Sequence, residues 1–506
     1  MDASAPHPHT VSGGSTERSA SDWVATGLVS TKSFSIACLI TTIAATLFNT
    51  VDINGFYESG DDHLGVDGPV LIKLVIALAA GLIGVAGTIC SRQVRQTLMT
   101  FPGLLLVAIS VVFLLTSAVA FKEVATTSRV AAVINMGYVC FVPTVIVVLG
   151  MRRFVIACLC GLVINALANW GLYLLMPQYG IFSEELGQET FVLRMGGLGH
   201  PNAIGRTGVL AGLLSLALLQ SSGSEHQAGK TQRPMNSTRP NDRQFGATAQ
   251  PWRRLLWMSI IVLAVATAIA AFSRSAVLAG LVAAGMLLID KLMTRVGIAS
   301  LLAVIAIAMA GLIVVELASG KAFRGDSLTS MVTKTGDIEE LTSATGRTAI
   351  WAEAVRLIAQ RPLQGWGLNS TPKLMQDFSM HTHNLVLHAT FSGGLIAGLL
   401  VLALLGWNLV FGLLSPLPLI RAISGYVLIS AIFEDTVLDT FASPSTLLWF
   451  AVLIYPATGQ QWLPGRRKAP FDSESDIESN ALPPYTGFQR PDPSGPSLPV
   501  SDDDPQ

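Results

Sequence analysis

The first residues suited to chemistry lie in the run RMGGLGHPN, from Arg194 to Asn202, at the start of a hydrophobic segment. Glycine allows a backbone to approach a ligand closely. Asn202 is placed to cap the helix that follows, where free N–H groups and the helix dipole attract an anion. Arg206 lies one turn further along that helix. We therefore expect an anion-binding site that draws on Arg194, His200, Asn202 and Arg206.

A second candidate is Arg274, which lies between two serines in a turn so short that two hydrophobic segments almost fuse. An arginine at the end of a membrane helix often does no more than extend to lipid headgroups. That role stays open for Arg206, but a headgroup contact does not require a tight Ser-Arg-Ser turn. Arg274, and Arg194 beside its glycines, are therefore the stronger candidates for contact with a ligand.

Three histidines, His381, His383 and His388, form the third group, at the start of a long hydrophobic segment. Imidazole exchanges protons near neutral pH and is also the commonest metal ligand. If a helix begins near His383, His388 is turned about 140° away from it, whereas metal-binding pairs on one helix are three or four residues apart. The spacing therefore argues against a metal site at these histidines, and no cofactor is expected. A histidine at the start of a helix more often caps the helix or packs as a polar group, and acid/base chemistry at His383 is the functional alternative.

The segment before these histidines predicts a short amphipathic helix between Gly346 and Pro362, with Arg347 off its apolar face. Pro362 ends the helix, and the following glycines can bring backbone close to another element. The residues that recur at helical spacing on the apolar face are Ile350, Trp351, Ala354, Val355 and Ile358.

Composition places these groups in a membrane protein. Of 506 residues, 51% are hydrophobic and only 13% are charged, with a mean hydropathy of +0.55, whereas about a quarter of the residues of soluble proteins are charged. The net charge of -1 argues against a nucleic-acid partner. The five cysteines all lie in hydrophobic runs and are expected to pack as small side chains, without disulfides or a zinc site.

Hydrophobic runs of about 17 to 25 residues, long enough to cross a bilayer, follow one another along the chain, and about twelve are predicted. The expected fold is an all-α, polytopic integral membrane protein. The predicted spans lie near 34–53, 69–89, 98–120, 130–149, 154–176, 202–220, 255–272, 275–290, 298–317, 385–411, 417–433 and 444–459.

The charges of the connecting loops predict the orientation, because short cytoplasmic loops carry the excess of Lys and Arg. Alternate loops are basic, among them Arg152 with Arg153 and the insert 221–254, which places both termini in the cytoplasm. The intervening loops 54–68 and 434–443 carry carboxylates and neither Lys nor Arg. The clusters around Arg194, Arg274 and His383 then all face the outer side of the membrane.

Glu434, Asp435 and Asp439 fall in one of these outer loops. A cluster of carboxylates after a hydrophobic segment is expected to be solvated. An acid/base or metal-binding role for the three nevertheless stays open.

Two segments between the spans are long. The insert 221–254 is rich in Pro, Asn, Gln and Gly without periodicity, which predicts disorder. The loop 318–384 has helical periodicity, which predicts a small helical domain on the outer side. The predicted order is a disordered cytoplasmic N-terminus at 1–33, transmembrane helices 1 to 9 within 34–317, the loop domain 318–384, transmembrane helices 10 to 12 within 385–460, and a disordered cytoplasmic tail at 461–506.

The order and placement of these motifs resemble the O-antigen ligase and O-antigen polymerase-like family of bacterial glycan-assembly membrane enzymes. That family is similar in its number of spans and in a large periplasmic loop between the ninth and tenth. The resemblance covers most of residues 34–460. The motifs that carry it are Arg194 before Gly196 and His200-Pro201-Asn202, Ser273-Arg274-Ser275, Gly346-Arg347 with Trp351, Pro362 to Gly367, and His383-Asn384-Leu385.

The resemblance implies transfer of a glycan from an undecaprenyl-diphosphate-linked donor to an acceptor hydroxyl at the periplasmic face of the bacterial inner membrane. Arg194 and Arg274 would stabilise the diphosphate leaving group, because arginine stays protonated and binds phosphate through two donors. His383 would orient or deprotonate the attacking hydroxyl, and no metal would be required. These three residues are expected to converge in one outward-opening cavity. The residues expected to bind substrate are Arg206, His200, Asn202, Arg347 and Asn384.

Several alternatives stay open. The acceptor could be a lipid, a growing glycan, as in a polysaccharide polymerase, or a protein, as in a protein O-glycosyltransferase. A transporter or flippase for a lipid-linked or anionic solute would place its charges near mid-membrane, open to both faces. A non-catalytic scaffold would need no convergent Arg and His set. The candidate charges lie at one end of the spans, which favours the enzyme.

Overall fold

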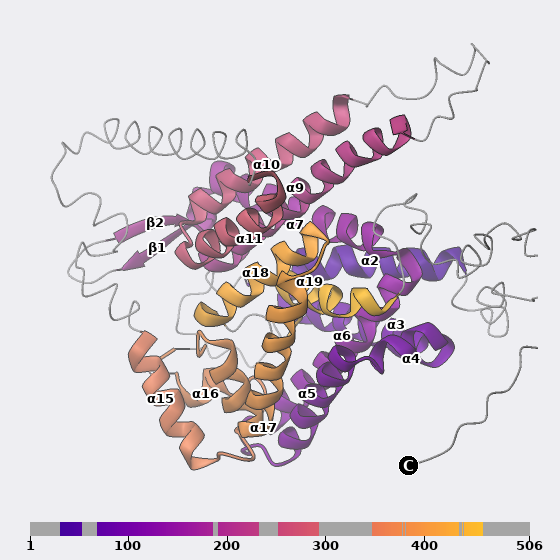
Figure 1. Cartoon of the computed structure of the whole chain (residues 1–506). Coiled ribbons are helices and arrows are strands. Elements are labelled where there is room, and N and C mark those ends of the chain that lie inside the picture. The colour runs from indigo at the N-terminus through magenta and orange to yellow at the C-terminus, as the bar shows by residue number, and fades with distance from the viewer. Residues whose placement is uncertain are drawn as a thin grey trace, which may run out of the picture. The chain divides into compact units, whose positions relative to one another are not determined.

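The computed structural model describes residues 31–52, 68–185, 191–231, 251–292, 347–376, 378–379, 381–434, 438 and 440–458. This part of the chain is mostly helical, as the sequence predicts (Figure 1). The helices are α2 (Lys32–Phe48), α3 (Gly68–Cys90), α4 (Arg92–Leu98), α5 (Phe101–Ala118), α6 (Ala125–Leu149), α7 (Met151–Leu175), α8 (Pro177–Gly180), α9 (Pro201–Thr231), α10 (Pro251–Ala271), α11 (Arg274–Leu292), α15 (Arg347–Gln360), α16 (Thr371–Leu374), α17 (Leu385–Trp407), η3 (Asn408–Gly412), α18 (Pro418–Phe433), α19 (Pro444–Ile454) and η4 (Tyr455–Thr458).

Within the described residues, seven stretches are long and apolar enough to cross a membrane. They lie in α3, α5, α6, α7, α9, α10 and the continuous segment from α17 through η3. Shorter apolar helices are α2, α11, α18 and the start of α19. In chain order these helices correspond to every predicted span except 298–317, which lies outside the described residues. The polytopic membrane character is thereby confirmed, and the count of twelve stays a prediction.

The segments predicted to be disordered, 1–33, 221–254 and 461–506, fall largely outside the described residues, as does the loop 318–384 up to residue 346. At three edges the helices run further than expected. α2 begins at Lys32, α9 continues to Thr231, well into the predicted insert, and α10 begins at Pro251, before the insert was expected to end. Hydrophobic periodicity marks where a helix leaves the membrane, but its backbone hydrogen bonds can continue into polar sequence.

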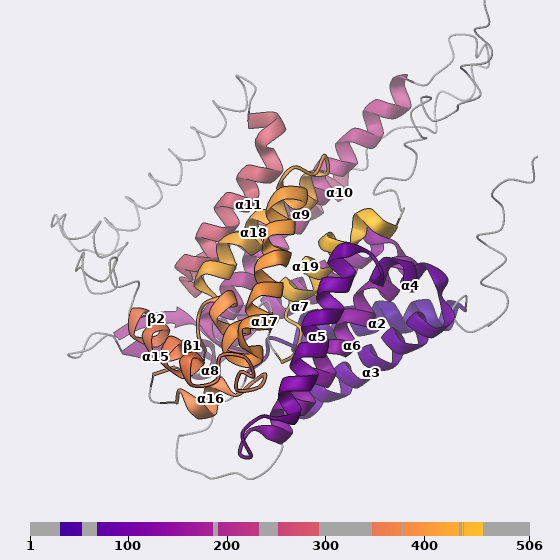
Figure 2. The same ribbon diagram turned by 60° about the horizontal axis from the view of Figure 1, so that its bottom comes forward.

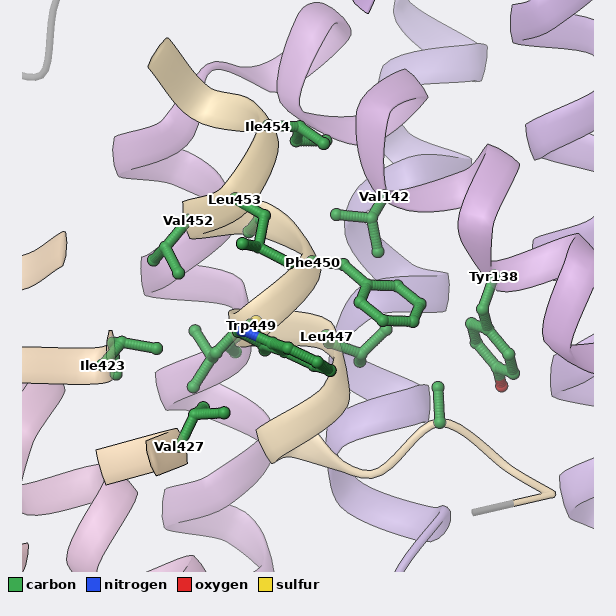
Figure 3. Close-up of a cluster of buried hydrophobic side chains, with 14 of the residues drawn as sticks. Tyr138, Val142, Ile423, Val427, Leu447, Trp449, Phe450, Val452, Leu453 and Ile454 are labelled. Atoms are coloured by element: carbon green, nitrogen blue, oxygen red, sulfur yellow. The ribbon is translucent and has the colours of Figure 1, made fainter. Parts of the chain in front are cut away.

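The core is centred on α19, in which every residue from Pro444 to Ile454 is buried. Figure 3 shows its aromatic side chains Trp449 and Phe450 between Val427 of α18 and Tyr138 of α6. Asn49, which follows α2, donates to Tyr138 OH (2.9 Å) and to the carbonyl of Ala442 (2.7 Å). These bonds fix the end of α2 against the chain that enters α19.

The amphipathic helix expected between residues 346 and 362 is α15. In Figures 1 and 2 it lies with α16 beside one end of α17. Its buried face differs slightly from the prediction, because Leu357 is buried with Ala354 whereas Val355 is exposed. Trp351 Nε1 donates to the carbonyl of Thr382 (3.1 Å), which ties α15 to the segment that carries the histidines.

α17 is interrupted at Gly394, whose backbone has φ 72° and ψ -175°. The turn after α15 fills the break. Trp366 N donates to Phe391 O (2.8 Å), Gly367 N to Ser392 O (2.8 Å), and Leu395 N to Pro362 O (2.7 Å). Broken helix backbone in a membrane protein requires such partners, because lipid offers none. The turn from Pro362 to Gly367 and the first half of α17 therefore form one unit.

Replacement of Gly394 by alanine is expected to destabilise this unit by about 1–3 kcal/mol or more, since its backbone angles are accessible to glycine almost alone. A Cβ there would also collide with the backbone of Leu363. Thermal melting and protease sensitivity around residues 362–367 would report the change. Gly406→Ala is the control, because that glycine lies in the same helix with open space around its Cβ position, so alanine should be neutral or stabilising. Equal melting temperatures for the two variants would contradict this role of Gly394.

A two-stranded hairpin, β1 (Ile181–Glu185) and β2 (Phe191–Met195), precedes α9 and is absent from the sequence prediction. The strands are antiparallel, with Phe182 opposite Arg194. The hairpin therefore fixes the position of Arg194, which lies in β2, and of the Gly-rich segment that follows.

Candidate active site

Glu434 is the centre of a buried polar cluster. It directly follows α18, and its backbone N–H still donates to Ser430 O (2.7 Å). Only 5% of its side chain is exposed. Ser275 Oγ donates to Oε1 at 3.0 Å, and Arg206 donates to Oε2 at 3.2 Å. The expectation of a solvated Glu434 is therefore wrong, whereas Asp435 and Asp439 lie outside the described residues.

Two more side chains face the same carboxylate. A terminal guanidinium nitrogen of Arg347, the first residue of α15, lies 3.5 Å from Glu434 Oε1, and His383 Nδ1 lies 3.7 Å from Oε2. The Arg347 guanidinium also lies 5.6 Å from the centre of the Phe433 ring, a cation–π separation. The cluster thus joins Arg206, Arg347 and His383, which are separated by long stretches of sequence.

The protonation of Glu434 follows from its neighbours. Burial alone would raise the pKa of this carboxyl. The adjacent His383 imidazole and the charges of Arg206 and Arg347 outweigh burial and lower the pKa to about 2. Glu434 is therefore ionised at neutral pH. Two guanidinium groups face one carboxylate, so the cluster retains a positive charge that suits an anionic ligand.

The two ring nitrogens of His383 face different groups. Its backbone has φ 50°, a left-handed conformation that is uncommon for residues other than glycine. Nδ1 faces the Glu434 carboxylate, and Nε2 lies 3.3 Å from Ser379 Oγ. A carboxylate at Nδ1 favours the tautomer with its proton there, which leaves Nε2 as a proton acceptor. In that tautomer, His383 Nε2 can accept a proton from a hydroxyl, as a general base does.

Asn384 directly follows His383 and precedes α17. Its Oδ1 accepts from Leu387 N (3.0 Å), which caps α17, and its Nδ2 donates to the carbonyl of Ile432 (3.3 Å) at the end of α18. The amide therefore joins the two helix ends that carry His383 and Glu434. This placement suits a positioning residue better than a direct ligand contact.

Arg194 is buried and fastens the hairpin to α10. Its Nε donates to the carbonyl of Ala271 (3.0 Å), the last residue of α10, and a terminal nitrogen donates to Asn202 Oδ1 (2.9 Å). Asn202 does not cap α9 in the expected way. Its backbone N–H donates to His200 Nδ1 (3.2 Å), so the imidazole takes that role because Pro201 already occupies the first helical position.

Arg274 is the first residue of α11, and only Phe272 and Ser273 separate it from α10, so the expected tight turn is present. Phe272 has φ 48°, and its ring lies 5.7 Å from the Arg274 guanidinium. The next residue, Ser275, reaches Glu434. The turn therefore brings the end of α10, which Arg194 holds, next to the Glu434 cluster.

A cavity of about 300 Å³ adjoins the cluster and shares Arg206 with it. None of Arg194, Arg274 and His383 is among the described residues that line it, so this cavity does not bring the expected trio together. Besides Arg206, the lining includes Asp52, Lys73, His200, Asn369, Thr371, His381 and His388.

Sequence reasoning kept an acid/base role open for Glu434 but expected it to be solvated, and it assigned no role to Ser275 or Ser379. Glu434 was grouped with two nearby aspartates, although it alone directly follows the hydrophobic run of α18. A carboxylate at that position, on the same side as several arginines, was the available signal. For Ser379 the signal was its spacing of four residues from His383.

Within the described residues, no three His, Cys, Asp or Glu side chains are grouped as metal ligands would be.

Residues 259–402 match the family model of the O-antigen ligases. This segment is O-antigen ligase-like. The resemblance predicted from the motifs is thereby confirmed. The ligase-like segment contains Ser275, Arg347 and His383, whereas Arg206 and Glu434 lie outside it. No curated protein matches the chain significantly.

Proposed function

We propose that the protein transfers a glycan from an undecaprenyl-diphosphate-linked donor to an acceptor hydroxyl at the periplasmic face of the inner membrane. The observation that carries the proposal is the buried cluster in which Glu434 faces His383, Arg206 and Arg347. The O-antigen ligase-like segment supports the reaction class. The loop charges of the sequence support the periplasmic orientation.

In the proposed reaction, the acceptor hydroxyl takes the place of Ser379 Oγ at His383 Nε2. Its oxygen attacks the anomeric carbon, the bond from that carbon to the diphosphate oxygen breaks, and the proton passes to Nε2. Glu434 holds Nδ1 and stabilises the imidazolium that forms. Undecaprenyl diphosphate leaves with the bonding electron pair.

The arginines stabilise the charge that develops on the leaving group. Arg206 and Arg347 already face one carboxylate, so they are arranged to bind an anion. Arg274 directly precedes Ser275 in the chain, and Ser275 contacts the same carboxylate. Arg194 contributes by holding the hairpin to the end of α10. Fixed donors of this kind need little reorganisation in the transition state, which is where their stabilising effect is largest.

The placement of charge favours an enzyme over a transporter. His383 precedes α17, Glu434 follows α18, and Arg274 begins α11, so these groups lie at helix ends. A transporter would place such charges near the middle of its spans, with access from both sides. A lipid, a growing glycan and a protein all remain open as the acceptor.

The test is transfer by the purified protein in liposomes that contain the lipid-linked donor. Each class of acceptor is added in turn, and released undecaprenyl diphosphate and glycosylated acceptor are measured. We expect the two products in equal amounts with one acceptor class. Absence of transfer with all three classes would contradict the proposal.

The same assay tests the metal-independent chemistry proposed for His383. Addition of a chelator is expected to leave the rate unchanged, because arginine charge serves the role that a metal has in many phosphate-transfer sites. Activity that a chelator abolishes and a divalent ion restores would instead assign the carboxylates to a metal.

A further inference from the structure

We propose that the cavity beside the Glu434 cluster is a saccharide subsite that selects a sugar with an anionic substituent, either phosphate or carboxylate. The proposal rests on the function proposed above and names a substrate class for it. The cavity is called the saccharide cavity below and consists of the space shared by Lys73, Arg206, Asn369, Thr371, His381 and their neighbours.

The size of the saccharide cavity limits its occupant. At about 300 Å³ it lies at the lower end of the range of about 300–1,000 Å³ found for small-molecule sites. One sugar residue fits such a volume, whereas a lipid tail or a complete oligosaccharide does not. The cavity shares Arg206 with the Glu434 cluster, so its occupant would lie next to the proposed reaction centre.

The polar lining suits a sugar. Asn369 and Thr371 offer an amide and a hydroxyl, and Asp52 offers a carboxylate. Thr371 is 1% exposed, and its Oγ1 has no hydrogen-bond partner within the described residues. A buried hydroxyl without a partner costs free energy. Because Thr371 lines the saccharide cavity, a rotation of its side chain would let a ligand hydroxyl or phosphate oxygen there satisfy it.

The charges favour an anionic sugar. Lys73 and Arg206 are fixed cations of the lining, and Asp52 is its carboxylate. Glu434, which pairs with Arg206, adds one negative charge, and Arg347, which pairs with Glu434, adds one positive charge. Three cations against two carboxylates leave a net positive charge, and the imidazoles of the lining add further donors when they are protonated. A phosphate or carboxylate on the sugar would balance this charge through charge-assisted hydrogen bonds.

The test is equilibrium binding to the full-length protein in nanodiscs, with glucose 1-phosphate, glucose and inorganic phosphate as probes. Glucose 1-phosphate is expected to bind at least about tenfold more tightly than either of the others, since it alone uses both the polar and the charged parts of the lining. Equal binding of glucose and glucose 1-phosphate, or binding of phosphate alone with the same affinity, would overturn the proposal. Absence of binding would overturn it as well.

Two variants locate the binding. Lys73→Gln should weaken the binding of glucose 1-phosphate about tenfold, because one charge-assisted contact is lost, and should leave the affinity for glucose unchanged. Thr371→Val should weaken the binding of both glucose and glucose 1-phosphate. The melting temperature should stay the same or rise, because the variant removes a buried hydroxyl that has no partner. Arg356→Gln removes a charge from the exposed side of α15 and serves as the control. Unaltered binding by both Lys73→Gln and Thr371→Val would place the ligand elsewhere.

Competition then identifies the source of the sugar. Displacement of glucose 1-phosphate by the lipid-linked donor would assign the saccharide cavity to the donor glycan, and displacement by the acceptor would assign it to the acceptor. Displacement by neither would overturn the proposal. His383→Asn should bind normally but fail in transfer. Transfer without binding would refute the subsite alone, whereas binding without transfer by the unaltered protein would refute the proposed function alone.

Discussion

Replacement of His383 by asparagine is expected to lower the rate of glycan transfer by roughly 10²- to 10⁴-fold, the usual contribution of a positioned general base. Asparagine is the appropriate substitute because His383 has a positive φ, and asparagine tolerates that conformation better than most residues. The loss should therefore reflect chemistry and not misfolding. Transfer rates in liposomes would be compared with melting temperatures of the same preparations.

His383→Ala separates the two contributions. Alanine removes the imidazole and also strains the backbone, so it should match asparagine in the loss of transfer but melt at a lower temperature. Transfer by His383→Asn within a few-fold of the unaltered protein would exclude His383 as the base.

Replacement of Glu434 by glutamine is expected to have the largest effect on stability. The variant leaves Arg206 and Arg347 largely buried without their carboxylate, and loss of one partner of a buried ion pair costs about 3–5 kcal/mol. Transfer should also fall, because His383 Nδ1 loses the group that fixes its tautomer. Melting temperature and transfer rate are the measurements.

The effect on stability should depend on pH. The pKa of Glu434 is about 2 in the folded protein against a usual value of 4.5, so the unfolded chain takes up the proton first as the pH falls. The stabilisation is therefore complete above about pH 4.5 and is lost as the pH falls towards 2. The difference in melting temperature between Glu434→Gln and the unaltered protein should narrow over that range.

Glu353→Gln provides a control, because Arg356, the partner of Glu353, is mostly exposed, whereas both arginines that face Glu434 are largely buried. An ion pair with a solvent-exposed arginine contributes little to stability. A difference between Glu434→Gln and the unaltered protein that did not change with pH would contradict the assignment of Glu434 as the buried, ionised centre.

Much of this architecture could be predicted from local sequence. The hydrophobic runs located the apolar helices, and the spacing from Ile350 to Ile358 located α15. The tight turn before Arg274 was also evident, because so few polar residues separate the two runs. These features depend on periods of a few residues, which a single sequence displays directly.

The features that were missed depend on contacts distant in sequence. The partners of Glu434 lie on α9, α11, α15 and the turn before α17, and nothing local distinguishes their carboxylate from a solvated one. The break in α17 at Gly394 is stabilised by a turn that follows another helix. Asn202 had the correct residue type for a cap, but Arg194 on the unpredicted hairpin takes its side-chain oxygen.

The central claim is that the imidazole of His383, held by Glu434, accepts the proton of the acceptor hydroxyl. Chemical rescue tests it most directly. His383→Gly tolerates the positive φ and leaves space for a free base, so added imidazole should raise its transfer rate by about tenfold or more without altering its melting temperature. Imidazole should have no effect on Glu434→Gln, in which the ring is still present. A His383→Gly variant that transfers glycan at the unaltered rate without imidazole, or that imidazole does not rescue, would contradict the account.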